Sequence, residues 1–301
     1  MTIVFALLSA LSSAVNLLTQ RVSSRAGPSG SPWRLAGYLL RQPLWLFGAA
    51  AAVGAFLFQA AALRYGRLSV VQPLLVTELV FVLVLRRLWL RQRVRSAAWG
   101  SAALTCVGLT VFLLAAEPRG GRVSPTSSAW AETIGVFGGA SVVMVALAAR
   151  GSPARRATLY GTAAAVVGAL AATFMKAATV TFTVHGPIAV LTSWTIYALL
   201  ASGIASGVLV QAALHVGPLR VSQPLMVVVN PIVSIWLSVW LFAEYFTDDI
   251  AVLAVAAGAF TAVAVGVVLL TRTAPRQDAR HAPEGTKGSV PTASDSTGSA
   301  R

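Results

Sequence analysis

The chain has 301 residues, of which 56% are hydrophobic and only 11% are charged, and its mean hydropathy is +0.76. This composition excludes an ordinary water-soluble globular protein. The formal net charge of +14 does not indicate nucleic-acid binding, because the Lys and Arg residues lie between long apolar runs, as they do in the loops of membrane proteins. The single cysteine, Cys106, excludes a disulfide framework and a cysteine-based zinc site.

Nine apolar runs approach the length of about 20 residues that crosses a bilayer. The first run has no basic segment before it and no small-residue cleavage site after it, which predicts a membrane helix rather than a secretory signal. The connections are short except for residues 21–42, which predicts a helical bundle. In chain order, the predicted helices are Thr2–Gln20, Pro43–Leu63, Leu68–Leu85, Ala97–Ala116, Trp130–Ala149, Ala157–Thr179, Pro187–Leu214, Leu219–Phe242 and Ile250–Thr271.

The distribution of positive charge predicts how the helices are oriented. With nine helices, eighteen Lys and Arg residues fall on one side of the membrane and four on the other, with Lys176 inside a helix. The positive-inside rule therefore predicts a multi-pass protein of the cell (plasma) membrane, with the N-terminus outside and the C-terminus cytoplasmic. Residues 275–301 are rich in Gly, Ser, Thr and Pro, which predicts a disordered cytoplasmic tail.

An internal repeat relates the two parts of the chain. An offset of 151 residues aligns 61–90 with 212–241 and gives thirteen identities in thirty positions, against the roughly three or four expected from shared apolar composition. Helices 1–4 therefore correspond to helices 6–9. The single linking helix between them predicts an inverted-topology repeat, the arrangement used by many transporters. The expected divisions are a transmembrane domain, 1–274, with a first half 1–128, a linking helix 129–150 and a second half 151–274.

The repeated motif carries a resemblance to a known family. Ala-Ala-Leu-x-x-Gly is followed by Gln-Pro in both halves, and in the second half by Asn230-Pro231 and by Glu244 at the helix end. With this pattern the chain resembles the drug/metabolite transporter (DMT) superfamily and its EamA-like modules, a resemblance that implies transmembrane transport of a small solute.

Within that superfamily, Ser12–Asn16 ahead of Gln20-Arg21, Trp45–Gly48 and the nine-helix count look most like the NIPA-type magnesium transporters. The resemblance covers most of residues 2–271. Two features depart from it: Arg93 occupies the repeat position that matches Glu244, and Pro43–Leu63 contains no acidic residue. Both departures count against magnesium as the substrate.

Glu78 and Lys176 are ionisable residues inside predicted helices. Glu78 is ten residues into its run, near the middle of the membrane, where a charge costs at least about 2.5–3.5 kcal/mol on insertion scales. It is therefore the first candidate for a coupling group that binds and releases a proton. The alternative is a structural acid facing the bundle. Lys176 either faces the cavity, where it pairs with Glu78 or holds an anionic substrate, or extends to the membrane interface without a function.

Polar and kink-forming residues supply the remaining candidates. Pro231 frees backbone carbonyls in mid-helix, so Asn230-Pro231 predicts a kink beside the transport route. Gln72 with Pro73, and Gln223 with Pro224, sit nearer their helix starts, where a proline is also tolerated as an N-terminal residue. Asn16 and Gln20 either project inward or form interhelical hydrogen bonds. Glu244 either concentrates cations at the channel mouth or is a solvated loop acid.

The leading functional hypothesis is a secondary transporter of a metabolite or drug-like solute, with alternating access and proton coupling through Glu78. The alternatives are a NIPA-like divalent-cation transporter, which needs several hard oxygen ligands, and a non-transporting membrane scaffold. An enzyme is disfavoured because no HExxH or G-x-S-x-G motif occurs. The expected partners are the lipid bilayer and a small-molecule or ion substrate, without a cofactor; a homodimer is compatible with the sequence.

Overall fold

The computed structural model describes residues 1–25, 41–91, 94–116, 119–121, 125–216, 219–246 and 249–273. In these ranges nine helical segments are long and apolar enough to cross a membrane. The predicted all-α polytopic membrane architecture is therefore confirmed. Outside this description lie the predicted disordered tail (275–301), residues 26–40 of the long connection, Arg93, and the side chains of Gln223 and Pro224.

The helices follow the predicted order, and two short strands join their ends. The elements are α1 (Thr2–Arg25), α3 (Pro43–Tyr65), α4 (Leu68–Leu75), α5 (Glu78–Leu88), α6 (Ser96–Ala116), β1 (Arg119–Gly120), α7 (Ser127–Thr133), the π-helical segment η1 (Ile134–Gly138), α8 (Gly139–Ala148), α9 (Pro153–Thr192), α10 (Trp194–Val216), α11 (Leu219–Phe242), β2 (Glu244–Tyr245) and α12 (Ile250–Thr273).

Two predicted helices differ from the structure. The predicted Leu68–Leu85 helix is interrupted at Val76 and Thr77, which separate α4 from α5. The predicted Pro187–Leu214 helix is wrong at its start, because Gly186 adopts a φ of 83° and Ser193 is extended, so that α10 begins at Trp194. A helix of that predicted length would measure about 42 Å, longer than the hydrocarbon core. Of the two breaks, the one at Ser193 lies inside this predicted helix and shortens it.

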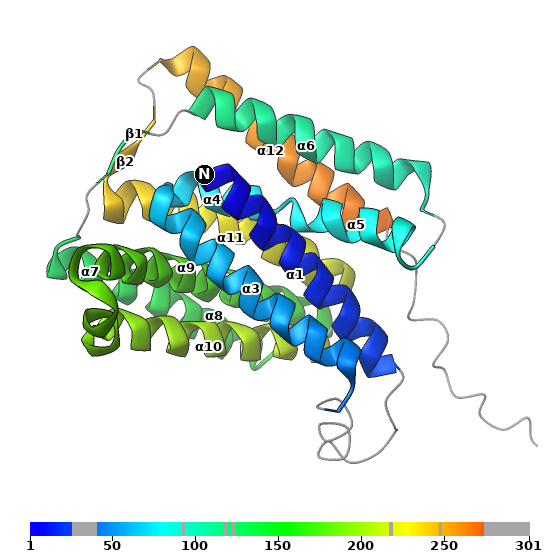
Figure 1. Cartoon of the computed structure of the whole chain (residues 1–301), viewed down its shortest axis with the longest axis horizontal. Coiled ribbons are helices and arrows are strands. Elements are labelled where there is room, and N and C mark those ends of the chain that lie inside the picture. Colours follow the sequence, from blue (N-terminus) through cyan, green and yellow to red (C-terminus); the bar gives the residue numbers. More distant parts are fainter. Residues whose placement is uncertain are drawn as a thin grey trace, which may run out of the picture.

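The helices pack in pairs along the bundle. As Figure 1 shows, α6 lies beside α12 on one flank, while α8, α9 and α10 form the opposite flank. The α1–α3 pair packs against α4, α5 and α9, and α11 contacts both α9 and α4. The main buried cluster joins these elements through residues that include Leu63, Leu68, Phe174 and Leu237.

The outer surface is apolar, as a bilayer requires. Leu57 on α3 and Ile204 and Val208 on α10 are each more than half exposed in the protein alone. Such residues would be a liability in water. In a membrane they contact lipid tails, so the protein is embedded in the bilayer through the outer faces of its helices.

The α6–α12 pair depends on close approach at Gly108. A Cβ atom at this position would lie 2.9 Å from the carbonyl oxygen of Ala259 and 3.0 Å from the backbone nitrogen of Val263, whereas a Cβ at Gly100 meets nothing within 4 Å. Both glycines lie on α6. Gly100 therefore provides a matched control on the same helix.

We predict that Gly108→Ala lowers the free energy of unfolding by about 1–3 kcal/mol, because the two backbones must move apart. Gly100→Ala should raise it by about 0.5–1 kcal/mol, because alanine loses less conformational freedom in a helix than glycine. Thermal unfolding of the purified proteins in detergent, followed by tryptophan fluorescence, measures both. Equal melting temperatures for the two variants would contradict the close packing.

Candidate functional site

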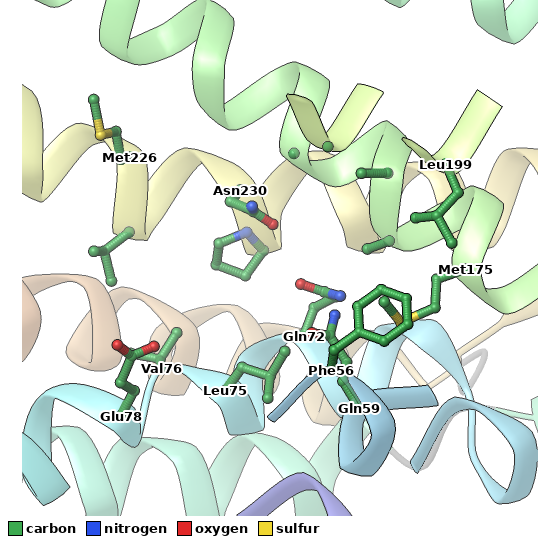
Figure 2. A pocket seen from close by; sticks show the side chains of 16 residues that line it. Phe56, Gln59, Gln72, Leu75, Val76, Glu78, Met175, Leu199, Met226 and Asn230 are labelled. Carbon is green, nitrogen blue, oxygen red and sulfur yellow. The ribbon is translucent and has the colours of Figure 1, made fainter. Parts of the chain in front are cut away.

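A cavity of about 430 Å³ lies between α3, α4, α5, α9, α10 and α11. This volume is typical of small-molecule sites. The walls are mainly apolar, and four polar side chains face the space (Figure 2). Lining residues are Phe56, Gln59, Gln72, Leu75, Val76, Glu78, Gly168, Ala171, Ala172, Met175, Leu199, Gly203, Met226, Val227, Asn230 and Pro231.

The interruption between α4 and α5 brings Glu78 to the cavity. Pro73 lies inside α4 and has no N–H to donate, and the turn after it tightens: Val76 N donates to Pro73 O and Thr77 N to Leu74 O, each at 3.1 Å. The hydroxyl of Thr77 also donates to Leu74 O, at 2.6 Å. Pro73 is therefore a helix-ending residue in this structure rather than an N-terminal one.

Glu78 begins α5 and lies in its first turn. Val76 and Thr77 keep right-handed helical φ and ψ, and Leu79 N and Phe81 N donate to Val76 O and Thr77 O. The chain therefore passes from α4 to α5 through a tightened turn, and the carboxylate at the start of α5 borders the cavity. Figure 2 shows Glu78 at one end of the cavity and Gln72 further along the same wall.

The side-chain amide of Gln72 lies on the cavity wall and has an unsatisfied hydrogen-bond donor. Its side chain is 5% exposed, and its Nε2 atom is buried without a hydrogen-bond partner among the described residues. An unsatisfied buried donor costs about 1–3 kcal/mol. Gln59 on α3 lies near it (Figure 2) and was missed by the sequence analysis. The sequence could have indicated Gln59, because it is an amide in an otherwise apolar predicted helix.

Asn230 faces these amides from α11 on the opposite wall (Figure 2). Its Oδ1 accepts a hydrogen bond from Ser234 Oγ at 3.3 Å, which leaves the Nδ2 group to face α9. A Cβ atom at Gly168 would lie 3.0 Å from that Nδ2, so the missing side chain at this glycine makes room for Asn230. Pro231 also lines the cavity, and α11 continues through it as one helix.

Lys176 does not line the cavity. Its Nζ donates to the carbonyl oxygen of Leu63 at 2.6 Å and to that of Gly66, which are at the C-terminal end of α3. A cation is favoured at this end of a helix, where carbonyls lack N–H partners. The contact therefore joins α9 to α3.

Glu244 caps the opposite kind of helix end, because its carboxylate binds N–H groups at the start of α4. Its carboxylate accepts hydrogen bonds from Leu68 N at 3.2 Å, Ser69 N at 3.4 Å and Ser69 Oγ at 2.6 Å. The side chain is only 2% exposed, so Glu244 is not a solvated loop acid. The chain reaches this position through Ala243, whose φ of 50° is uncommon for a residue other than glycine.

Arg67 completes this group within the turn between α3 and α4. Its Nε donates to Gly120 O at 3.2 Å, and Gly120 pairs with Glu244 in the β1–β2 ladder. Lys176 interacts electrostatically with Glu244 and Arg67. We refer to Lys176, Glu244 and Arg67 as the polar clamp, because they hold the α3–α4 turn of the first half against α9, β1 and β2.

The remaining predicted site residues lie away from the cavity. Gln20 Nε2 donates to Asn16 Oδ1 at 2.6 Å, and neither residue lines the cavity. The two amides therefore satisfy each other on α1. Backbone positions 223 and 224 belong to α11, although their side chains are outside the described part. The structure brings together Glu78, Gln72 and Asn230, and separates them from Lys176, Asn16 and Gln20.

Comparison with known proteins adds a distant relative. No family model matches the chain, and no solved structure matches it. The chain is 27% identical over 252 residues to an uncharacterised protein of Corynebacterium glutamicum, and the alignment covers 82% of this chain and 86% of that protein. These comparisons assign neither a family nor an activity.

We predict that Lys176→Met lowers the free energy of unfolding by about 2–3 kcal/mol, because two carbonyls at the end of α3 lose a charged donor. Glu244→Ala should have a similar effect, whereas Glu244→Gln keeps an acceptor for Ser69 and should cost about 1 kcal/mol. Thermal unfolding in detergent distinguishes them. Arg95→Met removes an exposed cation and is the control; a Lys176→Met melting temperature equal to that of Arg95→Met would contradict a structural role for the clamp.

Proposed function

We propose that the protein is a secondary transporter that moves a small solute across the membrane by alternating access, with Glu78 as the coupling group. The observation that carries the proposal is the cavity, which has one carboxylate at a helix break and is bordered by helices of both halves. Broken helices whose N-termini meet a cavity are the usual binding elements of secondary transporters. Irregular backbone at membrane depth is tolerated where it borders such a space.

The packing of the helices supports two related halves. If α1, α3, α4–α5 and α6 correspond to α9, α10, α11 and α12, then the α1–α3 pair matches the α9–α10 pair. The α4–α11 and α6–α12 pairs each join equivalent helices. One comparison is unequal: α3 packs on α9 far more extensively than α1 packs on α10. Unequal packing of equivalent pairs is what one state of an alternating-access cycle requires.

The polar clamp supports the assignment of a closed end. Lys176 and Glu244 come from the second half and hold the α3–α4 turn of the first half through five hydrogen bonds. The positive-inside rule puts this turn outside the cell. On this proposal the structure is closed to the outside, and outward opening requires release of the clamp.

A magnesium or other divalent-cation transporter is the second candidate, and the site favours it less. The cavity has one carboxylate, and no group of three His, Cys, Asp or Glu residues gathers anywhere in the described ranges. Hard divalent cations prefer six or more oxygen ligands with several carboxylates. The amide-rich lining fits an organic solute better.

We predict that Glu78→Gln abolishes coupled transport. Purified protein in proteoliposomes with trapped pyranine is given a pH gradient and a panel of amines, amino-acid amides, amino acids and Mg²⁺. At least one solute should drive proton movement in the wild type, and Glu78→Gln should reduce the rate more than tenfold, because the amide cannot carry the proton. Glu132→Gln changes an exposed acid on α7 and should keep the wild-type rate.

The scaffold alternative gives a different result in the same assay. If folded wild-type protein moves no solute of the panel and Glu78→Gln alters only thermal stability, the transporter proposal is wrong. If flux persists unchanged in Glu78→Gln, transport stands and proton coupling through this residue is excluded.

We also predict that loss of the clamp opens the cavity to the outside. In a Cys106→Ser background, Ala171→Cys places a thiol on the cavity wall, and Tyr65→Cys places one on an exposed position beside the clamp. In intact cells an impermeant maleimide should label Tyr65→Cys rapidly and Ala171→Cys slowly. Addition of Glu244→Ala should accelerate labelling of Ala171→Cys several-fold. An unchanged rate would show that the clamp does not close this end.

A further inference from the structure

The amide of Gln72 points to what the cavity recognises. In the described residues four buried side-chain atoms lack a hydrogen-bond partner, and only Gln72 Nε2 belongs to a residue that lines the cavity. The last side-chain torsion of glutamine is broad, so rotation about it can turn this N–H toward the space. A solute that offers an oxygen acceptor there would satisfy a donor that the protein leaves unpaired.

A second donor faces Gln72 from the opposite wall. Asn230 Oδ1 already accepts a hydrogen bond from Ser234 Oγ. The Nδ2 group of Asn230, which lies beside Gly168, is the part of this side chain that can donate to a solute. Figure 2 shows the two amides on facing walls. A carbonyl oxygen has two lone pairs and can accept from two donors at once. The pair of amides therefore suits a carbonyl or amide oxygen lying between them.

The charge of the cavity lining indicates the charge of the solute. Among the described side chains that line the cavity, Glu78 is the one ionisable residue. An anionic solute would meet this carboxylate, which is costly in a low-dielectric site. A cationic group near Glu78 is favoured. Phe56, Met175 and Leu199 provide apolar surface for the remaining part.

We infer that the cavity binds a small amphipathic amine that also carries a carbonyl or amide oxygen. Its ammonium group lies toward Glu78, its oxygen accepts from Gln72 and Asn230, and its apolar part contacts Phe56 and Met175. The inference rests on the proposed function, since it names the solute class of the same cavity. It makes Gln72 a specificity-determining residue: this side chain distinguishes amines with an oxygen acceptor from amines without one.

Three probes of matched size test the inference by direct binding to the purified protein in detergent, measured by calorimetry. Phenylalaninamide has the ammonium and the amide oxygen, 2-phenylethylamine has the ammonium alone, and phenylalanine adds a carboxylate. With concentrations expressed as the protonated amine, phenylalaninamide should bind about 3- to 10-fold more tightly than 2-phenylethylamine, the worth of about one hydrogen bond. Phenylalanine should bind most weakly.

Gln72→Met retains the length of the side chain and removes the amide. The variant should bind phenylalaninamide and 2-phenylethylamine equally, with the affinity for 2-phenylethylamine unchanged. A residue with only a packing role would change both affinities together. Equal affinities of the two amines for the wild-type protein, or a preference for phenylalaninamide that survives in Gln72→Met, would overturn the inference.

A second pair of variants covers the case in which Gln72→Met does not fold. A Cβ at Gly168 would lie 3.0 Å from Asn230 Nδ2, whereas a Cβ at Gly207, on α10 and outside the cavity lining, meets nothing within 4 Å. Gly168→Ala should therefore lower the preference for phenylalaninamide by about 3-fold or more, and Gly207→Ala should leave it unchanged. Identical preferences in the two variants would contradict the role of Asn230.

Measurements of binding and of transport distinguish failure of this inference from failure of the proposed function. Selective binding of phenylalaninamide without flux in proteoliposomes would preserve the solute class and refute transport. Proton-coupled flux of solutes without any preference for an oxygen acceptor would preserve transport and refute the solute class.

Discussion

Backbone N–H and C=O groups that are buried away from water need a partner within the protein, and this constraint organises the structure. At the turn between α3 and α4, two side chains of opposite charge bind the backbone groups that lack helical partners. Lys176 binds carbonyls at the end of α3, and Glu244 binds N–H groups at the start of α4. Each charge is at the helix end whose dipole favours it. Lys176 and Glu244 thereby cap two helix ends and join α9 and β2 to the α3–α4 turn.

The same constraint explains where the polar groups of the cavity lie. Pro73 removes a backbone donor, and the chain tightens and restarts as α5 at Glu78. The break borders the cavity rather than lipid, the location in which a broken helix is tolerated. Asn230-Pro231 occupies the facing helix, one repeat position from Glu78. Glu78 and Asn230 thus lie one step apart in the aligned sequence repeat and on facing walls of the cavity.

Most of the fold could be predicted because hydrophobic length is a strong signal. In the described ranges nine helices of the predicted order are long and apolar enough to cross a membrane, since about 20 apolar residues in a row admit few other structures in a membrane protein. The breaks at Thr77 and Ser193 were not predicted. Both lie in runs that remain apolar on either side, and hydropathy carries no information about φ and ψ. The break at Gly186 falls between the predicted helices 157–179 and 187–214, and it precedes Pro187, where the helical region is avoided.

The sequence by itself determined the nine helices of the described ranges that are long and apolar enough to cross a membrane, and it identified Glu78 and Asn230 as polar residues in mid-helix and Gln72 as an amide near a helix start. Only the tertiary structure decided which polar residues meet. It added Gln59 to the cavity and paired Asn16 with Gln20 on α1. It also made Lys176 and Glu244 helix caps, each with partners more than a hundred residues away. The physical reason is that hydropathy reports the depth of a residue in the bilayer, whereas its partners depend on how the helices rotate and pack.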